Sequence, residues 1–229
     1  MNALILLLGG SSQRFGGETP KQFLPIGDEL VFERSARLLL EAIPLYHACF
    51  VVHRDYLSHM FFLRAYEKLR QRFSKTLFWA CPGGESRHES FLAGVRQLKD
   101  LVGPDGKILV HDASRPFLNP GFLQTVKDAL SMLGPEKPCL IPTIAVSDSL
   151  CRSKKRGIVE SYENREEFFL IQTPQLLYAD ALYMALEKSR ARYDFPDEGS
   201  FMLEQGYPVY TFPGDRENRK ITYPTDLNP

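Results

Sequence analysis

The sequence ALILLLGGSSQRFGGETPKQF, residues 3–23, joins a run of six apolar residues to a loop rich in glycine and serine. The apolar run predicts a buried strand, because it is short and Gly9 and Gly10 end it. Glycines after a strand let backbone N–H groups approach a polyphosphate, and Arg14 and Lys21 could grip opposite sides of it. The spacing is neither GxGxxG nor GxxxxGK[ST]. These residues favour a loop that binds a nucleoside triphosphate; a strand-to-helix turn with two solvated cations is the alternative.

Beyond this loop, short apolar runs alternate with longer amphipathic stretches. The expected strands are residues 3–8, 48–52, 76–80, 107–111, 139–142 and 209–212. The expected helices are residues 30–42, 56–73, 87–98, 120–133, 179–190 and 197–205. Such alternation is typical of βα units around a mainly parallel sheet. Because no internal repeat or linker interrupts it, we expect one α/β domain over residues 1–229.

Residues 145–175 break this alternation. They contain a basic cluster at residues 152–156 and an apolar, strand-like run at residues 168–171, but no clean helical pattern. We expect a hairpin or arm that leaves the main sheet, and apolar residues on such an arm would need a partner surface. A long surface loop folded back on its own domain is the alternative.

The composition argues against several classes of protein. Lys and Arg together number 28, as do Asp and Glu, so the whole molecule offers no general attraction to nucleic acid or to an anionic membrane. The four cysteines lie far apart without a CxxC pair, and most lie in or next to apolar runs, so we expect reduced, buried thiols. The apolar run at residues 3–8 is too short for a signal peptide or a membrane span. We therefore expect a cytoplasmic protein with neither nucleic acid nor membrane as partner.

A second glycine motif, GGESRHES at residues 83–90, closes an expected strand and opens an expected helix. The free N–H groups of a helix N-terminus, with the hydroxyls of Ser86 and Ser90, could hold an anion or read the edge of a base. Ser86 followed by Glu89 also has the form of a capping box. Both interpretations can hold, since capping leaves other donors free.

Asp112 follows the strand expected at residues 107–111. Ligands of α/β folds bind at the carboxyl ends of sheet strands. A carboxylate there can coordinate Mg²⁺, with triphosphate and water supplying the other oxygens. The alternative is a turn in which Asp112 pairs with Arg115. His111 is expected to be structural, and Lys220, taken alone, is expected to be a solvated surface charge.

Four motifs in order resemble the 2-C-methyl-D-erythritol 4-phosphate cytidylyltransferase family. They are PKQF at residues 20–23, HDASRP at residues 111–116, TPQ at residues 173–175 and KIT at residues 220–222, and the resemblance runs from Ala3 to Leu227. It implies a Rossmann-like, mainly parallel twisted sheet flanked by helices, a projecting β-arm and a homodimer formed through that arm. The implied reaction joins CTP and 2-C-methyl-D-erythritol 4-phosphate to give 4-diphosphocytidyl-2-C-methyl-D-erythritol and pyrophosphate, with Mg²⁺ or another divalent cation, in isoprenoid precursor biosynthesis.

The resemblance also implies roles for individual residues. Arg14 and Lys21 would stabilise charge on the phosphates. Arg165 would reach the acceptor phosphate in the neighbouring subunit's site, and Lys220 would be the second acceptor-positioning cation. The implied nucleotide-binding residues are Gly9, Gly10, Ser11, Ser12, Gly83, Gly84, Glu85 and Ser90. The implied acceptor-binding residues are Asp112, Arg115, Ser149, Arg165 and Lys220, with Asp112 also the metal ligand.

Four positions depart from the family pattern, namely Ser12, Ser114, Pro196 and Arg219. They fall partly on the acceptor side, so ribitol 5-phosphate or another polyol phosphate is an alternative acceptor. A dinucleotide-dependent oxidoreductase is a further alternative, against which the absence of GxGxxG counts. The last alternative is a noncatalytic nucleotide-binding homologue, against which the retained cations count.

Overall fold

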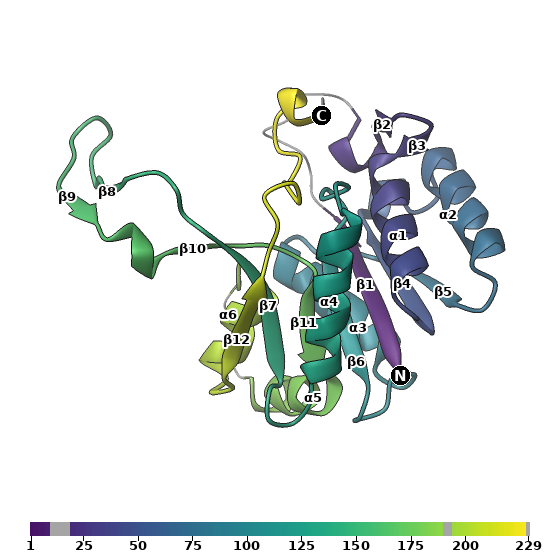
Figure 1. Cartoon of the computed structure of the whole chain (residues 1–229). Coiled ribbons are helices and arrows are strands. Elements are labelled where there is room, and N and C mark those ends of the chain that lie inside the picture. The colour runs from purple at the N-terminus through teal and green to yellow at the C-terminus, as the bar shows by residue number, and fades with distance from the viewer. Residues whose placement is uncertain (10–18, 190–193, 228–229) are drawn as a thin grey trace.

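A mostly parallel eight-stranded sheet forms the centre of the computed structural model, which describes residues 1–9, 19–189 and 194–227 (Figure 1). Along the sheet lie β10 (Phe169–Ile171), β7 (Cys139–Ala145), β11 (Gln175–Tyr178), β6 (Lys107–Asp112), β1 (Asn2–Leu8), β4 (His47–Val52) and β5 (Leu77–Pro82). β12 (Val209–Pro213) pairs with the other edge of β7 in parallel. Only β10 and β11 run antiparallel to their neighbours among these strands.

Six α-helices are present in the described part of the chain. They are α1 (Val31–Ala42), α2 (Met60–Arg72), α3 (Arg87–Leu98), α4 (Pro120–Met132), α5 (Ala179–Lys188) and α6 (Glu198–Glu204). Figure 1 shows α1, α2 and α4 on one face of the sheet and α3 on the other. The Phe201 ring of α6 contacts the Phe91 ring of α3, so α6 covers the same face as α3. Helices on both faces explain why the central strands are apolar without alternation.

The core follows the central strands. Residues 3–6 of β1 and residues 48–52 of β4 have no exposed surface, and β6 is buried from Ile108 onward. Because β1 pairs in parallel with both β4 and β6, the carboxyl ends of all three strands meet at one edge of the sheet. Figure 1 shows the C-terminal segment, in yellow, at this same edge. The fold therefore brings the predicted motifs to one place.

The predicted strands and helices are confirmed, with differences at their ends. The largest shift is in α2, which begins at Met60 and not at residue 56, because residues 54–56 form a separate 3₁₀ turn and the His59 side chain caps the helix. The pattern did not predict β11, whose four residues are all buried and so show no alternation. It also did not predict the small hairpin of β2 (Pro25–Ile26) and β3 (Glu29–Leu30).

Residues 146–168 extend away from the body of the molecule as an arm (Figure 1). Its tip is a hairpin of β8 (Leu150–Arg152) and β9 (Ser161–Glu163), followed by a 3₁₀ turn at Arg165–Glu167. The apolar side chains that follow are exposed, with Phe169 and Leu170 each at 55%. This exposure is what a partner surface would cover.

In the part of the chain that the structure describes, no helix combines the length and the apolar character needed to cross a membrane. All four cysteines are free, and Cys49, Cys81 and Cys139 are buried, as predicted for reduced thiols in apolar runs. Cys151 lies exposed on the arm.

Candidate active site

The two glycine loops meet at Ser90, in the first turns of α3. The Ser90 hydroxyl donates to the Ser86 carbonyl at 2.9 Å and accepts from the Gly84 N–H at 3.2 Å. A Cβ added to Gly9 would lie 2.9 Å from the Ser90 oxygen, and one added to Gly83 would lie 2.8 Å from it. Both glycines therefore let the loops after β1 and β5 close on one side chain, which places the two predicted nucleotide segments side by side.

The start of α3 is capped, although not by the predicted capping box. The Ser86 hydroxyl accepts from the Glu89 N–H at 3.1 Å, as expected. The Glu89 carboxylate, however, accepts from the Glu85 N–H at 2.7 Å and not from that of Ser86. A Cβ on Gly84 would lie 2.3 Å from the Glu89 Cβ, so this close return of Glu89 requires glycine there. The Glu85 side chain itself is 88% exposed.

Asp112, at the end of β6, lies within a chain of ion pairs. Its Oδ1 accepts from Arg87 Nε at 3.1 Å, and its Oδ2 accepts from Lys220 Nζ at 2.7 Å. Arg87 also donates from Nη1 and Nη2 to the two carboxylate oxygens of Glu198, at 2.7 and 3.0 Å. Asp112 and Glu198 are buried, while the Lys220 side chain is 38% exposed. The expectation that Lys220 is a solvated surface charge is therefore wrong.

The pKa values of the two buried carboxyls shift in opposite directions. Burial alone would raise the pKa of Asp112, but the charges of Arg87, Lys220 and Arg115 outweigh it and hold that pKa well below its usual range. Burial raises the pKa of Glu198, and Arg87 offsets this only in part. Asp112 is therefore a fixed anion at neutral pH.

Arg115 does not form the side-chain pair with Asp112 that the turn alternative predicted. The turn exists, since the Arg115 N–H donates to the Asp112 carbonyl at 3.0 Å. The Arg115 Nη1 instead donates to the Asn218 carbonyl at 2.9 Å. Its buried Nε has no hydrogen-bond partner among the described residues. Arg115 therefore lies beside Asp112 and ties the C-terminal segment to it.

His111 is fully buried and takes a structural role, as predicted. Its Nε2 lies 3.1 Å from the Arg115 carbonyl, and its Nδ1 lies 2.9 Å from the Thr173 hydroxyl. A carbonyl only accepts, so Nε2 carries the proton and Nδ1 accepts from Thr173. The same Thr173 oxygen accepts from the Asp112 N–H at 3.1 Å. This network suits a neutral imidazole, and burial lowers the pKa of His111 to about 4.

The low pKa of His111 predicts a pH dependence of stability. The unfolded chain binds a proton at this histidine near its ordinary pKa of 6.5, whereas the folded protein does so only near 4. The part of the stability that depends on a neutral His111 is therefore complete above pH 6.5, and we expect it to fall by about 3 kcal/mol as the pH falls toward 4. Urea unfolding of the wild type and of His111→Gln across this range measures it. The variant should show a smaller loss, and equal losses would contradict the assignment.

The C-terminal segment that carries Lys220 is anchored by buried amides. Asn218 is fully buried, and its Nδ2 donates to the Thr173 carbonyl at 2.9 Å. The Gln172 amide donates to the Asp215 carbonyl at 2.7 Å and accepts from the Asp215 N–H at 3.0 Å. These bonds hold Lys220 over Asp112. Thr173 belongs to a motif that the sequence singled out, whereas nothing in the sequence assigned an anchoring role to Gln172 or Asn218.

Lys21 starts a 3₁₀ turn at Lys21–Phe23 beside the end of β1. The neighbouring Gln22 is buried and donates from Nε2 to the Leu8 carbonyl at 2.7 Å, and Phe23 stacks on Tyr56 with ring centroids 4.9 Å apart. Backbone N–H groups lower the pKa of Asp226, and the charge of Lys21 adds to this effect. Lys21 therefore lies at the edge of the sheet where the C-terminal segment ends.

Several predicted residues lie elsewhere. Arg165 and Ser149 are on the arm, where Ser149 is exposed and Arg165 Nη1 donates to the Ser147 carbonyl at 2.6 Å. Within the described residues, neither makes an interaction with Asp112 or Lys220 of its own chain. Four other predicted residues lie outside the described part of the chain, namely Gly10, Ser11, Ser12 and Arg14.

The donor set at Asp112 fits one Mg²⁺ held jointly with substrate. Among the described residues, no group of three or more His, Cys, Asp or Glu side chains could hold a metal alone. Mg²⁺ at nucleotide sites commonly takes one or two carboxylates, with phosphate and water oxygens completing its shell. Each Asp112 oxygen accepts one charged hydrogen bond and keeps a further lone pair. Asp112 can therefore contribute to such a site.

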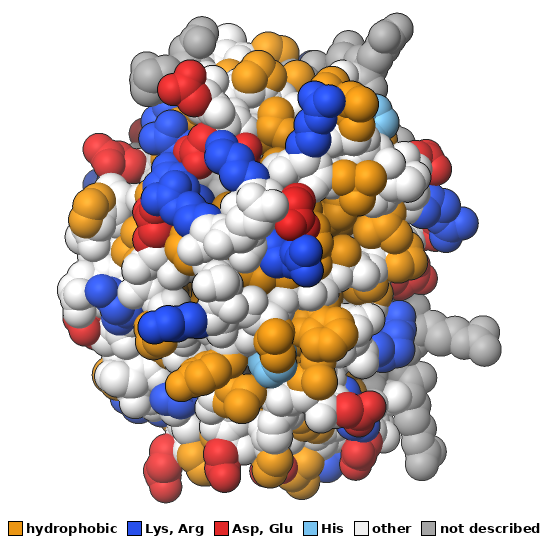
Figure 2. Space-filling view, turned by 90° about the vertical axis from the view of Figure 1, so that its right-hand side faces the viewer, with side chains coloured by type: hydrophobic (Ala, Val, Ile, Leu, Met, Phe, Trp, Pro, Cys, Tyr) orange, Lys and Arg blue, Asp and Glu red, His pale blue; other side chains and the backbone are white. Residues whose placement is uncertain are grey.

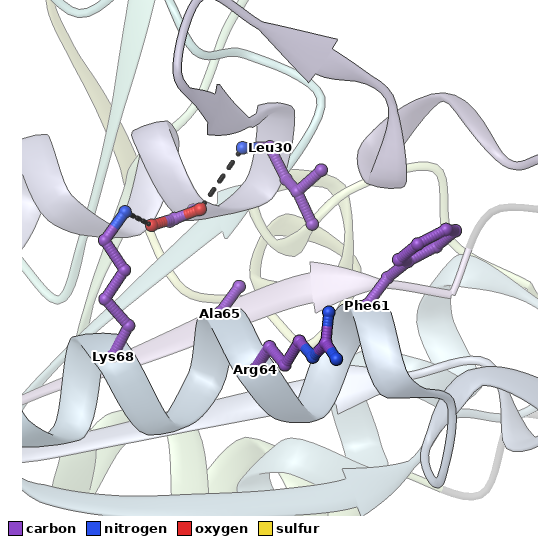
Figure 3. Close-up of a pocket in the computed structure, with 6 residues that line it drawn as sticks. Leu30, Phe61, Arg64, Ala65 and Lys68 are labelled. Carbon is purple, nitrogen blue, oxygen red and sulfur yellow. Dashed lines mark hydrogen bonds and ion pairs between the residues drawn. The ribbon is translucent and has the colours of Figure 1, made fainter.

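A cavity of about 220 Å³ lies apart from these residues, between α1 and α2 (Figure 3). Its lining comprises Leu30, Glu33, Phe61, Arg64, Ala65 and Lys68. Glu33 is nearly buried there and pairs with Lys68 Nζ at 2.6 Å. None of the predicted site residues lines this cavity, so it is not the candidate active site.

One departure from the family pattern has a structural explanation. The guanidinium of Arg219 lies 4.3 Å from the centre of the Phe117 ring. A planar cation over an aromatic face supplies contact area as well as attraction. Arg219, next to Lys220, therefore has an aromatic ring to pack against.

The sequence and the fold have relatives among known proteins. The sequence matches the family model of IspD, 2-C-methyl-D-erythritol 4-phosphate cytidylyltransferase, over residues 2–229. The 2-C-methyl-D-erythritol 4-phosphate cytidylyltransferase of Thermosipho melanesiensis is 27% identical, over 99% of this chain and 95% of that protein. The bifunctional enzyme IspD/IspF of Rhizobium leguminosarum bv. trifolii is 32% identical over 98% of this chain, which spans only 54% of that relative.

The solved structures agree with the sequence matches. A crystal structure of 4-diphosphocytidyl-2C-methyl-D-erythritol synthase superposes with a TM-score of 0.76 at 25% identity, covering 98% of this chain and 94% of that one. The IspD structure from Francisella tularensis has a TM-score of 0.75 at 19% identity, covering 99% and 96%, which supports the fold. With the family match over nearly the whole chain, this protein belongs to the 2-C-methyl-D-erythritol 4-phosphate cytidylyltransferase family.

Proposed function

We propose that this protein joins CTP and 2-C-methyl-D-erythritol 4-phosphate, giving 4-diphosphocytidyl-2-C-methyl-D-erythritol and pyrophosphate. The observation that carries the proposal is the Lys220–Asp112 pair at the end of β6, at the sheet edge where the two glycine loops close on Ser90. The two glycine loops are suited to a nucleotide, and the partly exposed Lys220 is suited to the phosphate of the acceptor. The family match over residues 2–229 supports the same reaction.

The reaction is a displacement at the α-phosphorus of CTP. A phosphate oxygen of the acceptor forms the new P–O bond, and the bond to the β-phosphate breaks to release pyrophosphate. A phosphate monoester has its second pKa near 6, so the nucleophile is already mostly a dianion at neutral pH. No general base is required, which agrees with the buried, structural position of His111.

Two anionic reactants must be brought together, and cations oppose their repulsion. We assign Arg14 and Lys21 to the triphosphate, where charge develops on the α-phosphoryl oxygens and on the departing pyrophosphate. Mg²⁺, when bound at Asp112, neutralises part of the triphosphate charge. Lys220 holds the attacking phosphate in line, and proximity of this kind contributes up to about 7–11 kcal/mol in favourable model systems.

The second acceptor cation, Arg165, belongs to a composite site in this proposal. Its position on the projecting arm, away from Asp112 of its own chain, supports a role in the site of a second copy (Figure 1). The exposed apolar residues of β10 support a homodimer formed through the arm. A twofold contact would place each arm against the partner's body.

Mixed dimers test this composite site. Coexpressed Lys21→Ala and Arg165→Ala chains pair at random, so half of the dimers are mixed and each has one intact site of two. We expect each variant alone to be nearly inactive and the mixture to recover about a quarter of wild-type turnover. Light scattering confirms the dimer in each preparation. An inactive mixture of dimers would contradict the exchange of Arg165 between subunits.

The surroundings of the site bear on partners, domain organisation and location. The main sheet draws strands from β1 to β12, which supports one nucleotidyltransferase domain over residues 1–229. The face in Figure 2 mixes both signs of charge with apolar side chains, so it offers no continuous basic surface to a polyanion. With the balanced net charge, this supports small-molecule partners in place of nucleic acid or membrane. The free, buried cysteines support a cytoplasmic location.

Pyrophosphate release tests the reaction. The purified protein is incubated with CTP, Mg²⁺ and either 2-C-methyl-D-erythritol 4-phosphate or ribitol 5-phosphate. We expect release with the first acceptor at a higher kcat/KM than with the second. A preference for ribitol 5-phosphate would reassign the acceptor, and CTP binding without release from any polyol phosphate would indicate a noncatalytic homologue.

A further inference from the structure

Glu198 is a buried carboxylate that no part of the mechanism above uses. It lies in the first turn of α6, and only 1% of its surface is exposed. Both of its oxygens accept from the guanidinium of Arg87, at 2.7 and 3.0 Å. Arg87 comes from the glycine motif at residues 83–90, and its remaining Nε donates to Asp112 at 3.1 Å. Glu198 therefore reaches Asp112 through one rigid side chain.

The backbone under Glu198 is held as firmly as its side chain. The Gly199 N–H donates to the buried Gln175 Oε1 at 2.8 Å, which ties α6 to β11. A Cβ on Gly199 would lie 3.2 Å from a methyl group of Ile141 in β7, so α6 packs closely against the sheet. The Asp197 side chain accepts from the Ser200 N–H at 2.7 Å and caps the same turn. Glu198 therefore holds the Arg87 guanidinium in one position.

Arg87 lies between the two carboxylates in a row of four charged side chains. Glu198, Arg87, Asp112 and Lys220 alternate in sign and sum to zero. If Lys220 moves from Asp112 to an acceptor phosphate, the buried Asp112 must keep a cation, since an unpaired buried charge is strongly unfavourable. Arg87 remains at Oδ1 in that event only while Glu198 holds the other two nitrogens. Without the bonds to Glu198, Arg87 would no longer be aimed at Asp112, and Lys220 would be left as the main hydrogen-bonding cation there, with the charge of Arg115 nearby.

We infer that Glu198 is a positioning residue for the acceptor half of the site, acting through Arg87 and Asp112 to leave Lys220 available to the acceptor phosphate. The inference rests on the proposed function and adds to it a residue that contacts neither substrate. Two parallel hydrogen bonds fix the plane of a guanidinium. The direction in which Arg87 Nε points therefore depends on Glu198. The competing explanation is a structural ion pair that only joins α3 to α6.

The acceptor and CTP affinities distinguish these explanations. Glu198→Gln keeps the shape and removes the charge, so one of the two hydrogen bonds from Arg87 loses its acceptor and the other is weakened. We expect the KM for 2-C-methyl-D-erythritol 4-phosphate to rise about tenfold or more. The KM for CTP and kcat should change by less than about threefold, because the substitution leaves Lys21, which we assign to the triphosphate, unchanged. Glu198→Asp keeps the charge and should recover part of the loss.

Glu33→Gln is the matched control. Glu33 is also a nearly buried glutamate that pairs with a cation, Lys68, at 2.6 Å, but it lies by the cavity of Figure 3. It should lose stability in thermal unfolding, as Glu198→Gln does, with neither KM changed. Equal rises in both KM values for Glu198→Gln, or no rise for the acceptor, would overturn the positioning role.

Direct binding keeps this test separate from that of the reaction. Calorimetric titration of 2-C-methyl-D-erythritol 4-phosphate, in the presence of a nonhydrolysable CTP analogue, gives the acceptor Kd of each variant without turnover. A wild-type protein that binds the acceptor but releases no pyrophosphate would refute the proposed reaction. The Kd ratio of Glu198→Gln to wild type would still decide the role of Glu198, and a ratio near one would reject it.

Discussion

Lys21→Ala should lower kcat for pyrophosphate release by about 10²–10³ while the protein stays folded. Removal of one preorganised cation from a site where charge develops has an effect of this size. The turn that carries Lys21 is held by its neighbours, through the Gln22 bond to the Leu8 carbonyl and the burial of Phe23. Because those contacts survive the substitution, the loss should appear in the chemical step and not in the fold.

Steady-state kinetics with saturating CTP measure this effect, with thermal unfolding as the check on folding. Lys75→Ala is the matched control, because Lys75 is an exposed lysine in the turn between α2 and β5. It should behave as wild type in both measurements. A Lys21→Ala enzyme with unchanged kcat would remove Lys21 from the reaction, whatever its effect on CTP binding.

Asp112→Asn should have the second large effect, on stability and turnover together. The substitution leaves Arg87 and Lys220 without the anion they share at 3.1 and 2.7 Å. Removal of one partner from a buried ion pair costs about 3–5 kcal/mol, because the remaining charge is left uncompensated. Urea unfolding at neutral pH measures the loss. Turnover should fall as well, since Lys220 loses its hydrogen-bond acceptor and any Mg²⁺ at this position loses its carboxylate ligand.

A comparison separates this burial effect from a general loss of charge. Asp55→Asn removes a carboxylate that is 73% exposed and lies 3.5 Å from His53 Nδ1, and it should cost well under 1 kcal/mol, because even an exposed ion pair contributes no more than that. In Asp112→Asn combined with Lys220→Met, the loss should be smaller than the sum of the single losses, because the same pair is removed twice. Additive losses would show that Asp112 and Lys220 do not interact.

Sequence patterns were sufficient for features that depend on local chemistry. The apolar runs at residues 3–8 and 107–111 identified buried strands because both faces of a parallel sheet are covered. Asp112 could be placed at a strand end, and Gly83 and Gly84 at a helix start, from neighbouring residues alone. The patterns failed at β11, where four fully buried residues show no period, and at Lys220, whose flanking residues give no sign of a buried partner.

The amino-acid sequence by itself determined the αβ alternation, the strand end at Gly9, the second glycine motif at residues 83–90 and the order of the charged motifs, since each depends on residues close together in the chain. Only the tertiary structure decided which charges meet. Arg87 and Glu198 are separated by 111 positions, and Asp112 and Lys220 by 108. Their pairing follows from parallel strands that end at one edge and from an α6 packed against β7. Burial then makes each pairing obligatory, because a charge removed from water requires a partner.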